Sequence, residues 1–196
     1  MESIIIKRIS ESIEIKNKIL HDSKLLNNVL QSAQIILEAI QKGNKIIFCG
    51  NGGSAADAQH LAAELMGKFY FDRKPLPAIS LTVNTSVLTA IGNDFSYEEI
   101  FIRQLQGIGE RGDVLVGIST SGNSKNIIEA FKYAKNNMIK TIAFTGESGG
   151  RLKDYADVLI NVPSEDTPRI QESHITLGHI ICEIVEKEII NEVDNS

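Results

Sequence analysis

Four hydroxyl side chains are crowded into six residues of this sequence, within the stretch GISTSGNS at residues 117–124. The stretch follows an apolar segment that predicts a strand and leads into a segment with helical periodicity. Hydroxyl groups and the free N–H groups of a helix N-terminus together bind a phosphate group without requiring a lysine. The alternative is a polar turn with Ser124 as the helix N-cap, which needs one hydroxyl rather than four. The stretch therefore favours a phosphate site formed by Ser119, Thr120, Ser121 and Ser124.

A second loop, CGNGGS at residues 49–54, also joins a predicted strand to a predicted helix. Its glycines allow positive φ angles and close approach of a ligand to the backbone. In parallel α/β sheets such loops lie at the carboxyl ends of the strands, where ligands bind. The loop has neither GxGxxG nor GxxxxGK[ST], so it does not indicate a nucleotide site. A tight turn with Asn51 or Ser54 as N-cap is almost as consistent with it as a ligand loop of Asn51, Gly52 and Gly53.

Two pairs of polar residues have a spacing that places side chains on one face of a helix. His60 and Glu64 are four positions apart, one helical turn, in the segment after the CGNGGS loop. Gln171 and His179 are eight positions apart in the last helical segment, about 80° around the helix, and His174 could face the same way. Spacing alone favours an ordinary surface pair for His60 and Glu64, and a core histidine for His179.

These loops and helices belong to an alternating series of strands and helices. Apolar and β-branched runs predict strands at 45–50, 76–81, 113–119, 140–146 and 156–162, and helical periodicity predicts helices at 54–66, 124–137 and 169–190. The alternation predicts one α/β domain with a mostly parallel sheet covered on both faces. Residues 3–42 predict two more helices, separated near residues 21–23. Their apolar surface exceeds what one sheet edge needs, so we expect an oligomerisation arm rather than only a cover for the sheet.

Length and composition limit the classes of protein. The 196 residues fit one domain, and 25 acidic against 20 basic residues give a net charge of −5. This charge argues against nucleic-acid and membrane partners, which call for a basic surface. No segment has the uninterrupted apolar length of a membrane span, and charges interrupt the isoleucine run near the start, unlike a signal peptide. We therefore expect a cytoplasmic protein in which Cys49 and Cys182 are reduced thiols.

The motifs together resemble those of the sugar isomerase (SIS) domain. The strand–GISTSGNS–helix unit resembles the phosphosugar-binding signature of that domain, and CGNGGS resembles its first loop. The similarity to the phosphoheptose isomerases extends along the chain through AIGNDFSYEEIF (90–101), TG (145–146) and TPRIQESH (167–174). The resemblance implies a three-layer αβα sandwich with a mostly parallel central sheet and an N-terminal helical extension. It also implies a single SIS domain over residues 1–196, with residues 1–42 as the oligomerisation arm of a homotetramer.

The resemblance further implies an activity and a site. The activity is conversion of sedoheptulose 7-phosphate to D-glycero-D-manno-heptose 7-phosphate through an enediol, which supplies heptose for lipopolysaccharide or capsule. One Zn²⁺ per subunit would be held by His60, Glu64, Gln171 and His179, with Glu64 and His179 also forming the acid–base pair. The implied substrate contacts are Asn51, Gly52, Gly53, Glu64, Asn93, Asp94, Ser119, Thr120, Ser121, Ser124 and Gln171. Without the resemblance, the glycine, asparagine and aspartate at 92–94 would indicate a simple turn.

Two alternatives stay open at this point. One SIS-domain relative is a binding protein that associates with the replication initiator; it keeps the glycine and serine loops but lacks the glutamate and the final histidine of the acid–base pair. This chain has both Glu64 and His179, which favours an enzyme. The other alternative is an isomerase of a different phosphosugar, because the loops recognise phosphate better than they recognise the length of the sugar.

Overall fold

The computed structural model describes residues 1–194 of the chain, and at its centre is a five-stranded parallel sheet. The strand order is β2–β1–β3–β4–β5, and β1 pairs with β3 over its whole length. The chain passes from β1 to β2 on one side of β1, and then crosses back to β3 on the other side of β1. The direction in which strands are added therefore reverses between β1 and β3. In open parallel sheets, ligands bind at the carboxyl ends of the strands beside this point. The strands are β1 (Ile46–Gly50), β2 (Ala78–Ser80), β3 (Val114–Ile118), β4 (Lys140–Thr145) and β5 (Val158–Asn161).

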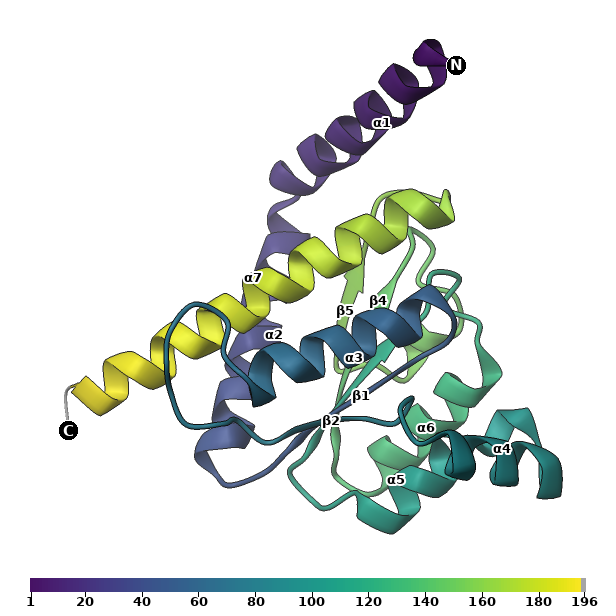
Figure 1. Cartoon of the computed structure of the whole chain (residues 1–196), viewed down its shortest axis with the longest axis vertical. Helices are drawn as coiled ribbons and strands as arrows, with labels where there is room; N and C mark the ends of the chain where they lie inside the picture. Colours follow the sequence, from purple (N-terminus) through teal and green to yellow (C-terminus); the bar gives the residue numbers. More distant parts are fainter. Residues whose placement is uncertain (195–196) are drawn as a thin grey trace.

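Helices cover both faces of this sheet and complete a three-layer sandwich (Figure 1). One face is covered by α2, α3 and α7, and the other by α5 and α6. The helices are α1 (Glu2–Leu20), α2 (Ser23–Gln41), α3 (Gly53–Met66), α4 (Thr85–Asp94), α5 (Ile102–Ile108), α6 (Lys125–Asn136) and α7 (Thr167–Asp194), with short 3-10 turns η1 (Tyr97–Glu99) and η2 (Leu152–Asp154). None of the helices within residues 1–194 combines the length and apolar character needed to cross a bilayer.

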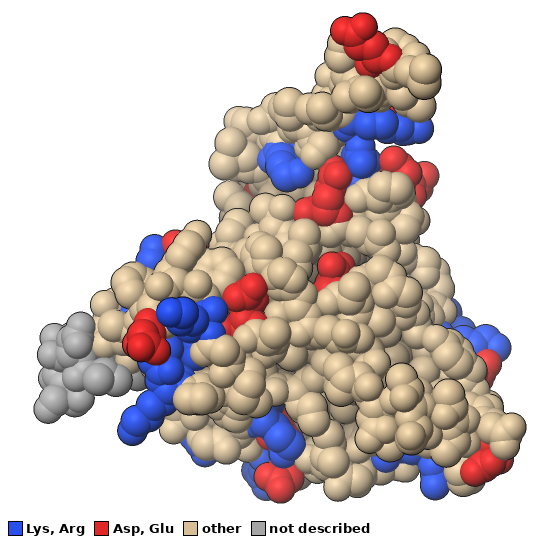
Figure 2. All heavy atoms as spheres, in the orientation of Figure 1, with Lys and Arg blue, Asp and Glu red and all other residues tan. Residues whose placement is uncertain are grey.

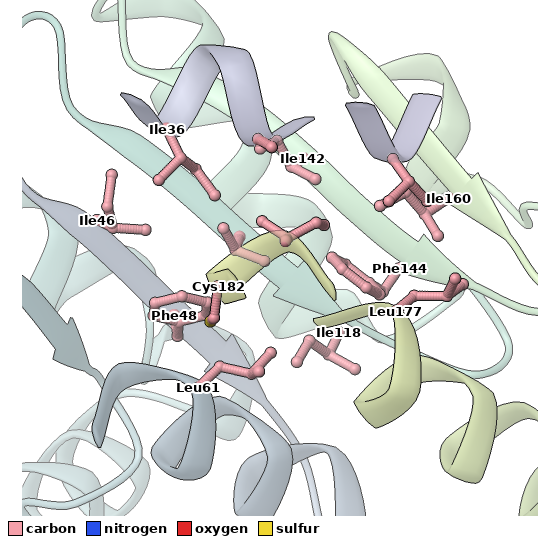
Figure 3. Packing of buried hydrophobic residues seen from close by; sticks show 14 of the residues in the cluster. Ile36, Ile46, Phe48, Leu61, Ile118, Ile142, Phe144, Ile160, Leu177 and Cys182 are labelled. Carbon is pink, nitrogen blue, oxygen red and sulfur yellow. The ribbon is translucent and has the colours of Figure 1, made fainter. Parts of the chain in front are cut away.

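Two hydrophobic clusters hold the layers together. On the α3 and α7 side, Phe48 and Phe144 of the sheet meet Leu61 and Leu177 of the helices, as Figure 3 shows. On the other side, α6 lies so close to β3 that a Cβ atom at Gly117 would be 2.3 Å from the Phe131 ring. Burial of each large apolar side chain contributes about 1.5–3 kcal/mol, so both helix layers are firmly fixed on the sheet. The loops after β1 and β3 therefore start from a rigid edge.

The two N-terminal helices have different environments. α2 packs on the sheet and on α7, with Val29 and Ile36 buried, and so covers the sheet. α1 projects from the body of the molecule (Figure 1), and most of its visible surface is neither acidic nor basic (Figure 2). Near its end Ile15 and Ile19 are buried, whereas the isoleucines nearer the N-terminus are 55–60% exposed: Ile4, Ile5, Ile6, Ile9 and Ile13. Of the segment expected to form an oligomerisation arm, α2 therefore belongs to the sandwich and α1 projects from it.

The predicted fold class is confirmed, and every predicted strand is present within a few residues of its expected limits. The region between β2 and β3 differs from the expectation. The turn indicated at 92–94 is the last turn of α4, a helix that the sequence patterns did not reveal. No residue of α4 is fully buried. Leu88 and Ile91 pack on the core while partly exposed, so the apolar face of this helix is short. α5 was missed as well, and with seven residues it is too short for a clear periodicity.

Candidate active site

The CGNGGS loop turns sharply from β1 into α3. Gly52 is the N-cap of α3 and has φ +56°, a left-handed conformation that favours glycine. The prediction that Asn51 or Ser54 caps this helix is wrong, because α3 has no side-chain cap. The Asn51 amide instead forms a reciprocal pair with the Asn126 amide, with both N···O distances at 2.9 Å, and accepts a hydrogen bond from the Tyr97 hydroxyl at 2.8 Å. The first loop is therefore tied to α6, the helix that follows the hydroxyl-rich loop.

The hydroxyl-rich loop connects β3 to α6 in the neighbouring position. Ser124 is the N-cap residue of α6, as the turn interpretation expected, yet its hydroxyl makes no cap hydrogen bond. It lies 2.9 Å from the hydroxyl of the buried Ser119. The Ser121 hydroxyl accepts a hydrogen bond from the Asn123 N–H at 3.1 Å. Because the hydroxyls of Ser119 and Ser124 bond to each other rather than to helix N–H groups, the N-terminus of α6 keeps donors available for an anion.

Hollows border both loops at the carboxyl edge of the sheet. A cavity of about 270 Å³ opens beside Thr120 and Ser121, between the loop after β4 and the start of α7. A second of about 130 Å³ borders Asn51 and Gly52 on the side of η1. A larger hollow of about 400 Å³ lies at the opposite, amino edge of the sheet and includes none of the predicted site residues. The two loops and their flanking cavities together make the carboxyl edge the place for a ligand.

Three predicted metal ligands converge between α3 and α7. His60 Nε2 lies 2.9 Å from Glu64 Oε1 and 2.9 Å from His179 Nε2. One ligand atom from each residue, a nitrogen of His60, a carboxylate oxygen of Glu64 and a nitrogen of His179, lies within 4.8 Å of the other two. The Nε2 proton of a neutral His60 cannot point at both neighbours at once, whereas a cation accepts lone pairs from all three atoms. Two imidazoles and a carboxylate are a donor set that suits a divalent transition-metal ion.

Gln171 lies apart from these three side chains. Its amide packs against the start of α3, where a Cβ atom at Gly53 would be 2.6 Å from Gln171 Nε2. α3 and α7 lie side by side and run in the same direction (Figure 1), since Leu61 in turn meets Gly178. At a helical rise of about 1.5 Å per residue, Gln171 and His179 are separated by about 12 Å along α7. A single chain therefore brings Gln171 to the CGNGGS loop and the other three residues to a metal-type cluster.

The remaining predicted residues have separate environments. Asn93 and Asp94 are exposed in the last turn of α4, where the Asn93 amide donates to Asp94 Oδ1 at 2.8 Å. His174 is buried against the sheet, with Nε2 3.0 Å from the Thr145 carbonyl oxygen, and does not face the cluster. Burial lowers the His174 pKa to about 4, although the Thr145 hydrogen bond opposes this shift. His174 is thus a neutral core residue.

Both cysteines are free and buried, as expected. Burial raises the pKa of the Cys49 thiol, whereas a nucleophilic thiol needs a lowered pKa. Burial also raises the pKa of Cys182, to about 12.

Several residues that shape the site were missed by the sequence patterns. Asn126 and Tyr97 hold Asn51, and the Phe69 ring packs on the His179 ring with centroids 5.5 Å apart. Asp57, one turn before His60, has a pKa that burial raises and His60 lowers, with burial dominant. The contacts of Asn51 and of His179 join segments that are distant in the chain, so local sequence patterns do not indicate them. Asp57 is three residues before His60, a spacing that the sequence does show.

Comparison with known proteins identifies the family of this chain. The family model described as "SIS domain" matches residues 11–146. The chain is 57% identical over 192 residues to a phosphoheptose isomerase from Clostridium acetobutylicum, covering 98% of each chain. It is 52% identical, with the same coverage, to one from Sulfurimonas denitrificans.

Solved structures support the same assignment. The phosphoheptose isomerase of Neisseria gonorrhoeae superposes with a TM-score of 0.90 at 44% identity, over 95% of this chain and 98% of that one. The enzyme from Francisella tularensis gives 0.91 at 35% identity, over 94% and 97% of the two chains. Sequence, fold and site geometry therefore lead to one conclusion: this chain belongs to the phosphoheptose isomerases, a family of enzymes built on the SIS domain.

Proposed function

We propose that this chain is an aldose–ketose isomerase that converts sedoheptulose 7-phosphate to D-glycero-D-manno-heptose 7-phosphate. The observation that carries the proposal is the convergence of His60, Glu64 and His179 in a chain 57% identical to a phosphoheptose isomerase. The product would supply heptose for surface polysaccharide. Because the substrate is a sugar phosphate, we expect the reaction to take place in the cytoplasm.

The reaction moves the carbonyl group from C2 to C1 of the sugar. A base removes a proton from C1 to form a 1,2-enediol, and a proton is then delivered to C2 while the oxygen atoms exchange protons. Carbon acids of this kind need a positioned base and a second group that serves the oxygens. We assign Glu64 as the base at carbon and His179 as the group that exchanges protons with O1 and O2. The 24% exposure of the Glu64 side chain leaves it accessible to a substrate.

A divalent metal ion fits the same side chains. His60, Glu64 and His179 would hold it, and we propose Zn²⁺ because nitrogen and carboxylate donors suit this ion. When bound, Zn²⁺ supplies Lewis-acid stabilisation of charge on the sugar oxygens. Within one chain these three residues leave room for a fourth ligand.

Substrate binding is divided between the two loops. Ser119, Thr120, Ser121 and Ser124 would bind the phosphate group together with the N-terminus of α6. Asn51, Gly52, Gly53 and Gln171 would contact the sugar, since the Gln171 amide lies against Gly53. Asn93 and Asp94 would approach the sugar from the exposed end of α4.

We further propose that the chain acts as a homotetramer. The exposed isoleucines of α1 form an apolar surface suited to burial against another copy. The separation of about 12 Å between Gln171 and His179 supports a metal site that takes Gln171 from a neighbouring subunit as its fourth ligand. Sedimentation of the purified protein would test the tetramer, and a monomer at micromolar concentration would contradict it.

The activity is tested by incubating the purified chain with sedoheptulose 7-phosphate and following the aldose C1 proton by NMR. The assay is run after treatment with a chelator and again after addition of Zn²⁺. We expect turnover that the chelator abolishes and Zn²⁺ restores. Absence of turnover with and without Zn²⁺ would refute the proposed function. Turnover that survives complete metal removal would refute the metal assignment alone.

A further inference from the structure

The loop between α3 and β2, residues 67–77, arches across α7 (Figure 1) and is bound there by one buried carboxylate. Glu186 of α7 has no exposed side-chain surface. It accepts hydrogen bonds from the backbone N–H groups of Phe69 at 2.8 Å, Tyr70 at 2.6 Å and Phe71 at 3.2 Å. It also accepts one from Arg73 Nε at 2.9 Å. Glu186 therefore fixes the backbone of the loop through three consecutive residues.

Arg73 extends the same network to the end of α3. Its side chain is 5% exposed, and its guanidinium donates to the carbonyl oxygens of Glu64 at 3.0 Å and Leu65 at 2.9 Å. Further donations reach Gly67 at 3.3 Å and Lys74 at 3.2 Å. The last carbonyl groups of a helix lack intrahelical partners and carry partial negative charge, so a guanidinium at this position satisfies both needs. Arg73 thus binds Glu186 with one edge and the last turn of α3 with the other.

This network lies next to the proposed acid–base pair. Glu64 is one of the residues whose carbonyl group Arg73 holds, and Glu186 is seven residues after His179, two turns along the same face of α7. The loop also carries Phe69, whose ring packs on His179. The ion pair therefore joins the helix that carries Glu64 to the helix that carries His179, and it orders a ring against the His179 imidazole.

We propose that Arg73 and Glu186 are positioning residues that set the placement of Glu64 relative to His179 for proton transfer. This inference rests on the proposed function, because it assigns the pair a role in the same reaction. A purely stabilising role is a poor explanation for such a pair, since desolvation of two buried charges offsets much of their attraction. A structural role alone also gives no reason for the pair to bind Glu64 from one side and support His179 from the other.

The test compares three variants of the full-length enzyme. Glu186→Gln removes the charge but keeps the shape, and Arg73→Lys keeps the charge but cannot reproduce the multiple donors of the guanidinium. The control is Asp113→Asn, at the residue that precedes β3. Asp113 is also a fully buried carboxylate, bound by the N–H groups of Lys45 and Glu110 and by the Lys45 ammonium at 2.8 Å.

Four quantities are measured for each variant: the urea midpoint of unfolding, kcat, KM, and the NMR signals of the His179 ring, which the Phe69 ring current shifts. We expect all three variants to lose stability. Only Glu186→Gln and Arg73→Lys should lower kcat at least tenfold with KM within threefold of the parent, and only these two should displace the His179 signals.

The outcomes separate a structural role of Arg73 and Glu186 from a positioning role. If Glu186→Gln and Arg73→Lys keep kcat and His179 signals as the Asp113→Asn control does, the pair is only structural and the inference is refuted. If Glu186→Gln fails to fold, Arg73→Lys decides by the same criteria. An inactive parent enzyme would refute the proposed function instead, and the His179 signals would still show whether the pair positions the imidazole.

Discussion

Gly53→Ala is a small change that separates the stability of α3 from the position of the Gln171 amide. The added Cβ would lie 2.6 Å from Gln171 Nε2, whereas ordinary contacts begin at 3.4 Å, so the amide must move by about 0.8 Å. The Gln171 side chain is flexible and can move at low energetic cost. Alanine in a helix is otherwise more stable than glycine by about 0.5–1 kcal/mol. The variant should therefore fold at least as well as the parent while its Gln171 amide is displaced.

The expected functional loss is large compared with the structural change. Misplacement of a substrate-positioning group by about 1 Å can reduce the rate about 100-fold, so we expect kcat/KM to fall by about 10- to 100-fold. The melting temperature should stay the same or rise by up to about 4 °C, the shift that about 1 kcal/mol gives in a domain of this size. Turnover is followed by NMR with sedoheptulose 7-phosphate, and melting by calorimetry.

Gly107→Ala is the matched control. Gly107 also lies in a helix, α5, and a Cβ atom there would have no neighbour within 4 Å. It should gain a similar amount of stability and keep full activity. If Gly53→Ala retains kcat/KM within twofold of Gly107→Ala, the Gln171 amide does not position the substrate, and this reasoning is refuted.

Three further predictions concern the proposed base Glu64, the proposed phosphate loop and the buried His174. Glu64→Gln should lower kcat at least about 100-fold while the circular dichroism spectrum is unchanged, because the base at carbon is lost; near-normal turnover would exclude Glu64 from the mechanism. Ser121→Ala should raise KM by about 10- to 150-fold with little change in kcat, since a hydrogen bond to a charged phosphate is worth about 1.5–3 kcal/mol; an unchanged KM would mean that this hydroxyl only orders its own turn. His174 has a folded-state pKa of about 4, below its unfolded value, so the unfolded chain binds more protons as the pH falls from about 6.5 to 4. The free energy of unfolding should therefore fall by about 3 kcal/mol over that range in urea titrations, and the part of the slope due to this residue should be absent in His174→Gln.

The sequence patterns revealed those parts of the fold in which local periodicity and burial agree. The strands at 45–50 and 113–119 are buried on both faces and appear as continuous apolar runs, so they could be located from composition alone. α4 could not, because none of its residues is fully buried and its last turn contains a glycine, an asparagine and an aspartate.

The parts of the candidate site that depend on local spacing could also be predicted from the sequence. His60 and Glu64 meet because a spacing of four fixes both angle and rise within one turn. The same reasoning from angle alone placed Gln171 with His179 and overlooked the rise of eight residues along the axis. Asn51 was expected to cap its own helix, but its amide pairs with Asn126, a residue 75 positions away. Contacts of that kind depend on tertiary structure and leave no local trace.

The reciprocal amide pair between Asn51 and Asn126 has a consequence for how ligands bind. It connects the loop after β1 to α6, the helix that follows the proposed phosphate loop, so we expect a conformational change in one loop to affect the other. A ligand that orders the proposed phosphate loop should therefore also lower the entropic cost of ordering the loop after β1. By thermodynamic linkage, a ligand that orders the loop after β1 should lower the cost of ordering the phosphate loop to the same extent. Inorganic phosphate and an unphosphorylated sugar, each a fragment of the substrate, should accordingly bind with positive cooperativity.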